Sequence, residues 1–225
     1  MTAPANRFDL SHPAGRRAAE RDYLLGDHAF LRTWFQNAHW ISDELVRTNQ
    51  PSPKQLAAWK ERGIKTVINL RGGFDASFYA LEKEACERLG LTLVDFTVTS
   101  REAPSKVQIR GAKNLFQSIA YPALMHCKSG ADRDGVMSVL YRHFRQGEPI
   151  RTAVRELSLR YLHIRQGKTG VLDYVFDRYL AEGEPRGLTF LDWVESDAYD
   201  PVKLKAEFRA GMIGSVLTEK LLRRE

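Results

Sequence analysis

The sequence predicts an α/β fold with a small, mainly parallel central sheet flanked by helices. Apolar, β-branched stretches alternate with helical stretches along the chain, which is typical of parallel strands joined by helices. The run 66–70 has the β-branched and apolar composition of a strand covered on both faces. A second short apolar run, 123–125, leads through a tight glycine-containing loop into an apolar-periodic helix at 136–144.

The N-terminal part predicts a tail followed by a segment rich in aromatic residues. Residues 1–22 are polar, without the apolar stretch of a secretion signal, and are expected to form the tail. Large apolar side chains then gather between residues 23 and 40. They predict a helix packed on the core; the alternative is a membrane-facing amphipathic helix, although basic residues are few. These side chains are Leu24, Leu25, Phe30, Leu31, Trp34, Phe35 and Trp40.

The middle of the chain contains the predicted sheet. Residues 40–48 predict a hairpin that turns at Asp43 and Glu44, and two prolines then begin a helix that ends before Gly63. The other predicted strands are 66–70, 91–98 and 123–127, and the other predicted helices are 77–89, stopped by Gly90, and 105–120.

The last third of the chain predicts helices only. They are expected at 148–162, 169–180 and 192–194, and in a tract from 201 to 224 interrupted by Gly211 and Gly214. We expect one domain over residues 23–181, with residues 182–225 as a helical extension packed on it.

Composition limits the partners and the compartment. Lys and Arg number 34 against 28 acidic residues, and the net charge of +6 suits anionic substrates or surfaces. No nucleic-acid-binding motif accompanies this charge, so nucleic acid is not an expected partner. Two cysteines do not make a disulfide framework, and no apolar run is long enough to span a bilayer. We therefore expect a cytoplasmic protein, with peripheral contact to the inner membrane surface as an option.

The loop 127–133 contains residues that can bind and attack a phosphoryl group. A loop between a strand and a helix N-terminus presents backbone N–H groups and the positive end of the helix dipole to an anion. Arg133 provides a planar fork that matches two phosphate oxygens. Helix N-termini and nearby cations lower a thiol pKa from about 8.5 to roughly 3.5–7.5, so Cys127 is expected to be a thiolate nucleophile. The alternative is an ordinary buried cysteine.

The order His126-Cys127, five residues, Arg133 resembles the signature of the cysteine-based protein tyrosine and dual-specificity phosphatases. Residues 45–53 and 63–71 also resemble the opening segment of atypical bacterial dual-specificity phosphatases. The resemblance implies a dual-specificity-phosphatase-like fold and a metal-independent, cofactor-free hydrolase of phosphate monoesters that forms a phosphocysteine intermediate. It also implies which residues hold the phosphate: Lys128, Ser129, Gly130, Ala131, Asp132 and Arg133.

Three carboxylates compete for the role of general acid. Asp132 is favoured, because myotubularin-like lipid phosphatases and a group of bacterial phosphatases carry an aspartate immediately before the arginine. Asp95, at the end of a predicted strand, and Glu102, where related enzymes place a mobile acid loop, are the alternatives. Asp132 could instead only cap the helix.

One residue departs from the family pattern. Asp134 stands where the family usually has serine or threonine, and a carboxylate there raises the thiol pKa unless it turns outward. This leaves open a phosphate-binding pseudophosphatase. Arg71 and Lys128 add positive charge; Arg71 could contact substrate or form a structural ion pair. Cys86 is expected in the core, or in a reversible disulfide with Cys127.

The resemblance does not identify the substrate. The charge, Lys128, Asp132 and the aromatic segment favour a lipid or inositol phosphate, or the lipid A phosphate of similar bacterial proteins. A phosphotyrosine-bearing phosphoprotein is the alternative.

Overall fold

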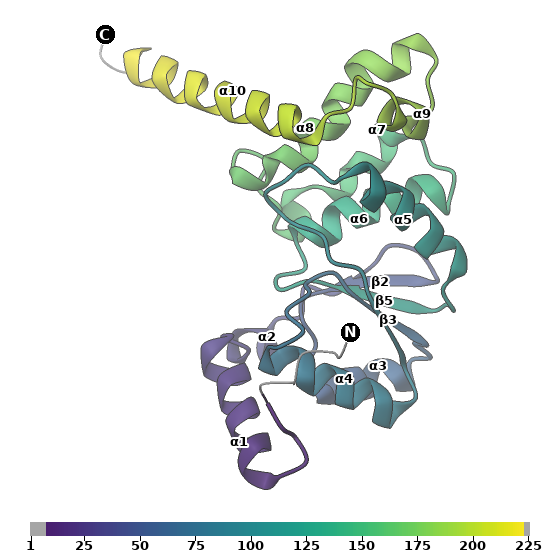
Figure 1. The fold of residues 1–225 in the computed structure, drawn as a ribbon, viewed down its shortest axis with the longest axis vertical. Helices are drawn as coiled ribbons and strands as arrows, with labels where there is room; N and C mark the ends of the chain where they lie inside the picture. Colours follow the sequence, from purple (N-terminus) through teal and green to yellow (C-terminus); the bar gives the residue numbers. More distant parts are fainter. Residues whose placement is uncertain (1–7, 223–225) are drawn as a thin grey trace. The chain divides into compact units, whose positions relative to one another are not determined.

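The structure is a computed structural model that describes residues 8–222, with side chains described as far as residue 212. The chain forms two compact units (Figure 1). The first runs to Val98 and resumes over Ser118–Asp134, and the second comprises Thr99–Gln117 and the chain from Gly135 onward. No helix of the described residues combines the length and the hydropathy that a membrane span requires.

The first unit is built on a five-stranded sheet in the order β1-β2-β5-β3-β4. Strand β1 is antiparallel to β2, and all other neighbours are parallel, which confirms the predicted fold class. The register places Thr48, His126, Asn69 and Asp95 side by side at the carboxyl ends of the parallel strands. The strands are β1 (His39–Trp40), β2 (Leu45–Thr48), β3 (Thr66–Asn69), β4 (Thr92–Asp95) and β5 (Ala123–His126).

The helix predicted after the two prolines and the helix predicted at 77–89 are both present. The Ser52 side chain and Gln55 form a capping box that starts α3, and Gly90 takes a left-handed conformation (φ 63°) that ends α4. The predicted hairpin is also present, as β1 and β2. The helices of this unit are α1 (Pro13–Arg21), α2 (Phe30–Trp34), α3 (Pro53–Glu61) and α4 (Ser77–Leu89), with a π-helical turn η1 (Asp22–Gly26) between α1 and α2.

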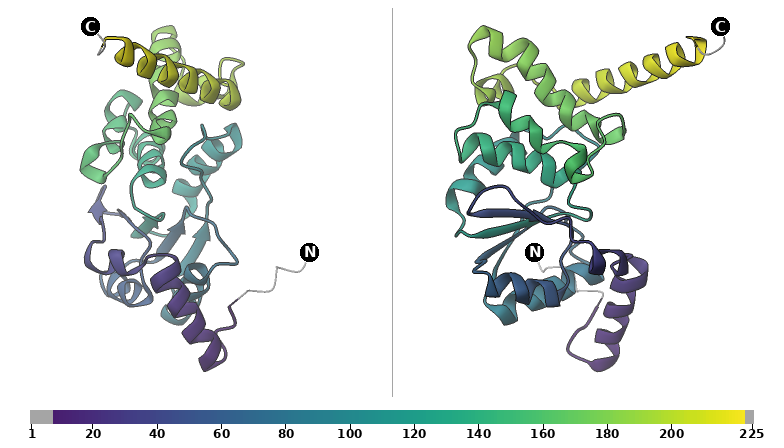
Figure 2. Two further views of the ribbon diagram at one scale, coloured as in Figure 1. Left: turned by 90° about the vertical axis from the view of Figure 1, so that its left-hand side faces the viewer. Right: turned by 180° about the vertical axis from the view of Figure 1, so that it is seen from behind.

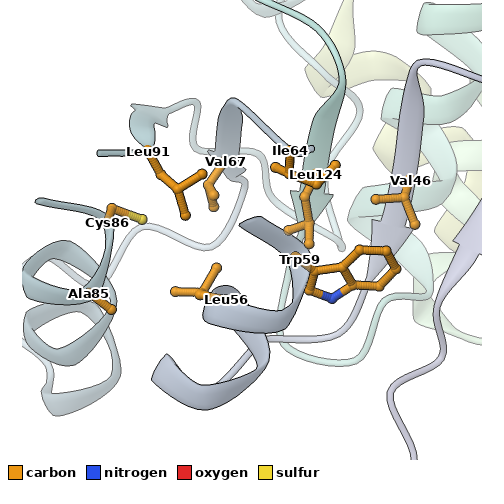
Figure 3. Packing of buried hydrophobic residues seen from close by; sticks show 9 residues of the cluster. All are labelled: Val46, Leu56, Trp59, Ile64, Val67, Ala85, Cys86, Leu91 and Leu124. Carbon is orange, nitrogen blue, oxygen red and sulfur yellow. The ribbon is translucent and has the colours of Figure 1, made fainter. Parts of the chain in front are cut away.

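Helices α3 and α4 pack on one face of the sheet (Figure 3). Leu56 and Trp59 from α3, with Cys86 from α4, meet side chains from three parallel strands in one buried cluster. The Cys86 thiol is therefore a core group, as one of the two interpretations of this residue predicted. The strand side chains of the cluster are Val46, Val67 and Leu124, and Ala85, Ile64 and Leu91 complete it.

The second unit is helical and has an aromatic core. Trp193 is fully buried and contacts the rings of Tyr179, Phe190 and Tyr199. Figure 2 shows the last helix as one continuous rod. The helices are α5 (Lys106–Ser118), α6 (Asp132–Phe144), whose first turn belongs to the first unit, α7 (Ile150–Ala153), α8 (Val171–Arg178), α9 (Phe190–Glu195) and α10 (Pro201–Leu222).

Two helix predictions for the C-terminal third are wrong. The expected helix 148–162 stops after Ala153 and continues as 3₁₀ turns, the second of which ends at Leu162 with φ 66°. The expected interruption of the last tract does not occur, because α10 continues through Gly211 and Gly214. A glycine costs a helix only about 1 kcal/mol relative to alanine, which neighbouring turns can absorb.

The aromatic segment also differs from the favoured prediction. Its seven large apolar side chains are exposed, from 43% for Phe30 to 92% for Trp34, and do not fill the core. The charged residues Asp27 and Arg32 take the buried positions, because they form an ion pair with each other. The expected tail contains helix α1, tied to α4 by an ion pair between Arg16 and Glu84; residues 1–7 lie outside the described part.

Candidate active site

The loop after β5 lies at the carboxyl edge of the parallel strands, where α/β sheets bind their ligands. It runs from Cys127 to Ala131, and α6 begins at Asp132. The entire stretch from Cys127 to Asp134 belongs to the first unit, so its contacts can be described within that unit.

The loop requires a glycine at position 130. Gly130 has φ 74°, and a Cβ atom there would lie 2.8 Å from the backbone N of Asn49 and 2.9 Å from the carbonyl carbon of Thr48. A side chain would therefore both strain the backbone and push the loop away from the end of β2.

Arg47 of β2 supports the loop from the protein interior. It is fully buried and donates from Nη2 to the carbonyl oxygens of Gly130 (3.1 Å) and Ala131 (2.8 Å). Arg47 is not among the site residues expected from the sequence. The feature that could have identified Arg47 is its charge within a short strand. The other three residues of the strand, Leu45, Val46 and Thr48, are buried.

The two preceding carbonyl groups of the loop also have donors. Asn37 Nδ2 donates to the Ser129 carbonyl (3.1 Å), and the backbone N–H of Gln50 donates to the Lys128 carbonyl (3.4 Å). In a trans peptide the next N–H points away from the carbonyl. Residues outside the loop thus hold the loop carbonyls, and the N–H groups turn to the other side, where Gly130 N–H points at Cys127 Sγ (3.3 Å).

Cys127 is buried, and its thiol pKa is raised by this burial and by the charge of Asp134. Arg133 and the N–H groups of Gly130 and Ser129 oppose the rise. The expectation of a lowered thiol pKa is therefore wrong for this loop, because the burial and the carboxylate outweigh the cation and the backbone dipoles.

Asp134 turns inward and is fully buried. Its burial raises its pKa to about 7, although Arg47, His126 and Arg133 act in the opposite direction. The carboxyl group contacts Cys127. Near neutral pH, Asp134 and Cys127 therefore compete to hold one proton in the same buried space.

His126 is fixed below the loop by an ion pair. Its Nε2 lies 2.6 Å from Glu82 Oε1, and both side chains are fully buried. Burial lowers the pKa of His126, but Glu82, the charge of Asp134 and the hydrogen bond to the Cys127 carbonyl together raise it above its ordinary value. Gln50 Nε2 also donates to Glu82 Oε1 (3.0 Å). The contact with Glu82 occupies Nε2, so this nitrogen is not placed to act as a base for the loop.

The three candidate acids occupy different surroundings. Asp132 is half-buried in the first turn of α6, beside the loop. Asp95 is two strands away from His126 at the same edge and accepts hydrogen bonds from Asn69 Nδ2 (3.0 Å) and Tyr79 Oη (2.6 Å). Glu102 belongs to the second unit, where it pairs with Lys205. The choice of Asp132 as general acid stays a prediction.

Asp27, which was not among the expected site residues, forms ion pairs with the two cations beside the loop, Lys128 and Arg71. Asp27 Oδ1 lies 3.1 Å from Lys128 Nζ, and Arg71 Nη1 donates to Asp27 Oδ2 (2.8 Å). Arg71 thus forms the structural ion pair that was its alternative role. Its guanidinium also lies 3.5 Å above the centre of the Phe78 ring. Burial alone would raise the pKa of Asp27, but Arg71, Arg32 and Lys128 lower it to about 2.

Comparisons with known proteins give a matching family model and similar folds. The model of a family described as DSP-PTPase phosphatase fused to NAD+ kinase matches residues 37–169. Tk-PTP in its active form is 19% identical over 64% of this chain and 99% of its own, with a TM-score of 0.51. P. aeruginosa TpbA is 18% identical over 71% of this chain and 88% of its own, also with a TM-score of 0.51. These two likenesses concern the fold. No curated protein sequence matches the chain.

Proposed function

Because the chain belongs to the family of DSP-PTPase phosphatases fused to NAD+ kinase, we propose that it hydrolyses phosphate monoesters through a phosphocysteine intermediate. The observation that carries the proposal is the loop itself. Its carbonyl groups are held from outside, its Gly130 N–H points at Cys127 Sγ, and Arg133 follows in the first turn of the helix. Such a preorganised set of donors binds a tetrahedral oxyanion without rearrangement.

The reaction takes two displacements at phosphorus. The Cys127 thiolate forms the S–P bond while the P–O bond to the leaving group breaks, and Asp132, as the proposed acid, gives the leaving oxygen its proton. Water then attacks phosphorus and gives a proton to the Asp132 carboxylate, the S–P bond breaks, and the thiolate and inorganic phosphate are released with the acid restored. Arg133 and the N–H groups of residues 128–133 hold the equatorial oxygens through both steps.

Asp134 supplies the proton that the usual serine or threonine hydroxyl would offer to the sulfur. A neutral carboxyl group at this position can donate a hydrogen bond to the thiolate, whereas its anion repels the thiolate. Since the pKa of Asp134 is raised to about 7, its carboxyl group is neutral at mildly acidic pH and does not oppose ionisation of Cys127 there. At higher pH Asp134 is ionised, so formation of the thiolate would place two negative charges side by side.

A lipid or inositol phosphate is the substrate class that the surroundings favour, with a phosphotyrosine-bearing phosphoprotein as the alternative. Lys128 and Arg71 add cationic charge beside the loop, and the exposed aromatic segment offers peripheral contact with a membrane. The mechanism needs neither metal nor cofactor, and the free thiol fits a reducing compartment such as the cytoplasm.

A pseudophosphatase is the second candidate, and the raised pKa of Cys127 favours it. A thiol that stays protonated beside a buried carboxylate would bind phosphate without attacking it. The two candidates share the loop and differ only in the chemistry at sulfur.

The test compares the reduced, metal-free protein with its Cys127→Ser variant. We expect hydrolysis of p-nitrophenyl phosphate that survives a chelator and disappears in Cys127→Ser, while phosphate binding measured by calorimetry is retained. Phosphate binding without hydrolysis in the unmodified protein would favour the pseudophosphatase, and activity lost on chelation would contradict the metal-free mechanism. Phosphoinositides, inositol phosphates, lipid A and phosphotyrosine peptides assayed in parallel would identify the substrate class.

A further inference from the structure

The second unit contains a cavity of about 390 Å³ among α10, the turn that precedes α8 and the loop that precedes α5. We call it the basic cavity, because four cationic side chains line it. Its lining residues all belong to the second unit, so it shares no residue with the loop 127–133 of the first unit. A cavity of this volume is within the range of sites for small molecules. The four cations are Arg101, Lys168, Lys205 and Arg209.

Three of the four cations have no carboxylate partner among the described residues. Arg101, Lys168 and Arg209 are exposed, and no acidic residue in the described part of the chain forms an ion pair with any of them. Only Lys205 is neutralised, by Glu102. Like charges that converge on one concave site repel each other, and the low-dielectric walls focus their field on any anion that enters. The charge of the basic cavity therefore favours an anionic ligand.

The acidic residues of the neighbouring helices do not supply this anion. Each described acidic residue of α8 and α10 is bound to another side chain outside the basic cavity, so its charge is already used. The pairs are Glu207 with Arg178 (3.4 Å), Asp173 with His163 (2.7 Å) and Asp177 with Arg165.

The basic cavity also has an apolar wall, made by Val171, Phe208 and Met212. Phe208 is held against α8, since the centre of its ring lies 5.9 Å from that of Tyr174. Gly170 leaves room for this ring, because a Cβ atom there would lie 3.1 Å from Phe208 Cζ. An apolar wall beside unpaired cations matches a ligand that has both an anionic and an apolar group.

We propose that the basic cavity is a second anion site, which binds an organic phosphate through both its phosphate and its apolar group. Arg101 and Arg209 provide planar forks that match phosphate oxygens, and Lys168 adds a third positive charge. The apolar group of the ligand packs on Phe208 and Met212. The inference goes beyond the proposed hydrolysis and does not depend on it, because the chemistry at Cys127 uses none of these residues.

The first experiment titrates the full chain with three phosphonates by calorimetry. 1-Naphthylphosphonate, hexylphosphonate and methylphosphonate carry the same anionic group on a C–P bond that phosphate ester hydrolysis does not break. We expect the naphthyl or the hexyl compound to bind roughly tenfold tighter than methylphosphonate, because its larger apolar group is buried. The tighter of the two identifies an aromatic or an alkyl ligand. No binding, or equal affinity for all three compounds, would overturn the proposal.

Variants assign the binding to the basic cavity, with the tighter phosphonate as the probe. Arg209→Ala and Lys168→Ala should each weaken its affinity about fivefold or more, since each removes a charge-assisted contact. Arg186→Ala, the matched control, removes an exposed arginine elsewhere in the second unit and should leave the affinity unchanged. The binding should also persist in Arg133→Ala, which lacks the arginine of the phosphate loop. Binding that is lost in Arg133→Ala, or retained in a folded double variant Lys168→Ala, Arg209→Ala, would refute the proposal and place the probe at the loop.

Discussion

Replacing Asp134 by serine removes a buried carboxylate from the side of the nucleophile. Two unit charges about 4 Å apart interact by about 4 kcal/mol at the effective dielectric of about 20 that suits protein sites. At about 1.4 kcal/mol per pKa unit, this equals roughly three units. Arg47, His126 and Arg133 already offset part of the carboxylate charge. We therefore expect Asp134→Ser to lower the pKa of Cys127 by roughly one to two units.

The assay is the pH dependence of alkylation by iodoacetamide, followed by mass spectrometry of the peptide that contains Cys127. Asp43→Ser, which removes an exposed acid from the hairpin turn, is the matched control and should leave the alkylation profile unchanged. An unchanged or higher pKa of Cys127 in Asp134→Ser would refute the reasoning, because it would mean that burial alone sets the thiol pKa.

Stability provides a second readout of the same side chain. The folded pKa of Asp134 is raised from 3.8 to about 7, so between these values the folded state holds a proton that the unfolded state has lost. Its contribution to the free energy of unfolding therefore decreases as pH rises, by about 1.4 kcal/mol per pH unit. Asp134→Asn should remove this slope in urea titrations between about pH 4 and 7; identical slopes for the two proteins would show that Asp134 is ionised throughout.

Two further predictions concern the acid and the loop. Asp132→Asn should slow hydrolysis of an alkyl phosphate by about 10²–10⁴ and affect an aryl phosphate with a good leaving group less. Asp95→Asn and Glu102→Gln should not discriminate between the two substrates. Selective loss of alkyl phosphate hydrolysis in Glu102→Gln would instead place the acid at residue 102. Gly130→Ala should abolish phosphate binding, since its Cβ would lie 2.8 Å from a backbone nitrogen. Gly147→Ala, with φ 72° and no atom within 4 Å of its Cβ, is the control for backbone strain alone and should bind phosphate normally.

The sequence predicted those elements whose start, apolar face and end depend on residues close together in the chain. The helix 77–89 was predicted at its observed bounds, because its apolar face repeats at helical spacing and Gly90 stops it with a left-handed residue. The expected helix 148–162 failed because nothing in its composition signals the break after Ala153. The prediction that the aromatic segment packs on the core is wrong. Hydrophobicity indicates a tendency to be buried but does not identify the surface against which a side chain packs.

The sequence by itself determined the loop that carries the proposed nucleophile and the arginine. Cys127, Gly130 and Arg133 are close along the chain, and a strand, a tight turn and a helix N-terminus leave little freedom in how they are arranged. The family resemblance also fixed Asp134 as the departure from the usual residue.

Only the tertiary structure decided the charge state and support of that loop. Arg47 reaches carbonyl groups 83 and 84 residues later, Glu82 meets His126, and Asp27 pairs with Lys128 across a sheet edge. The direction in which Asp134 points also depends on Arg47 and His126, which lie on neighbouring strands. Burial and Coulomb interactions act through space between residues far apart in the chain, so no local pattern of residues can specify them.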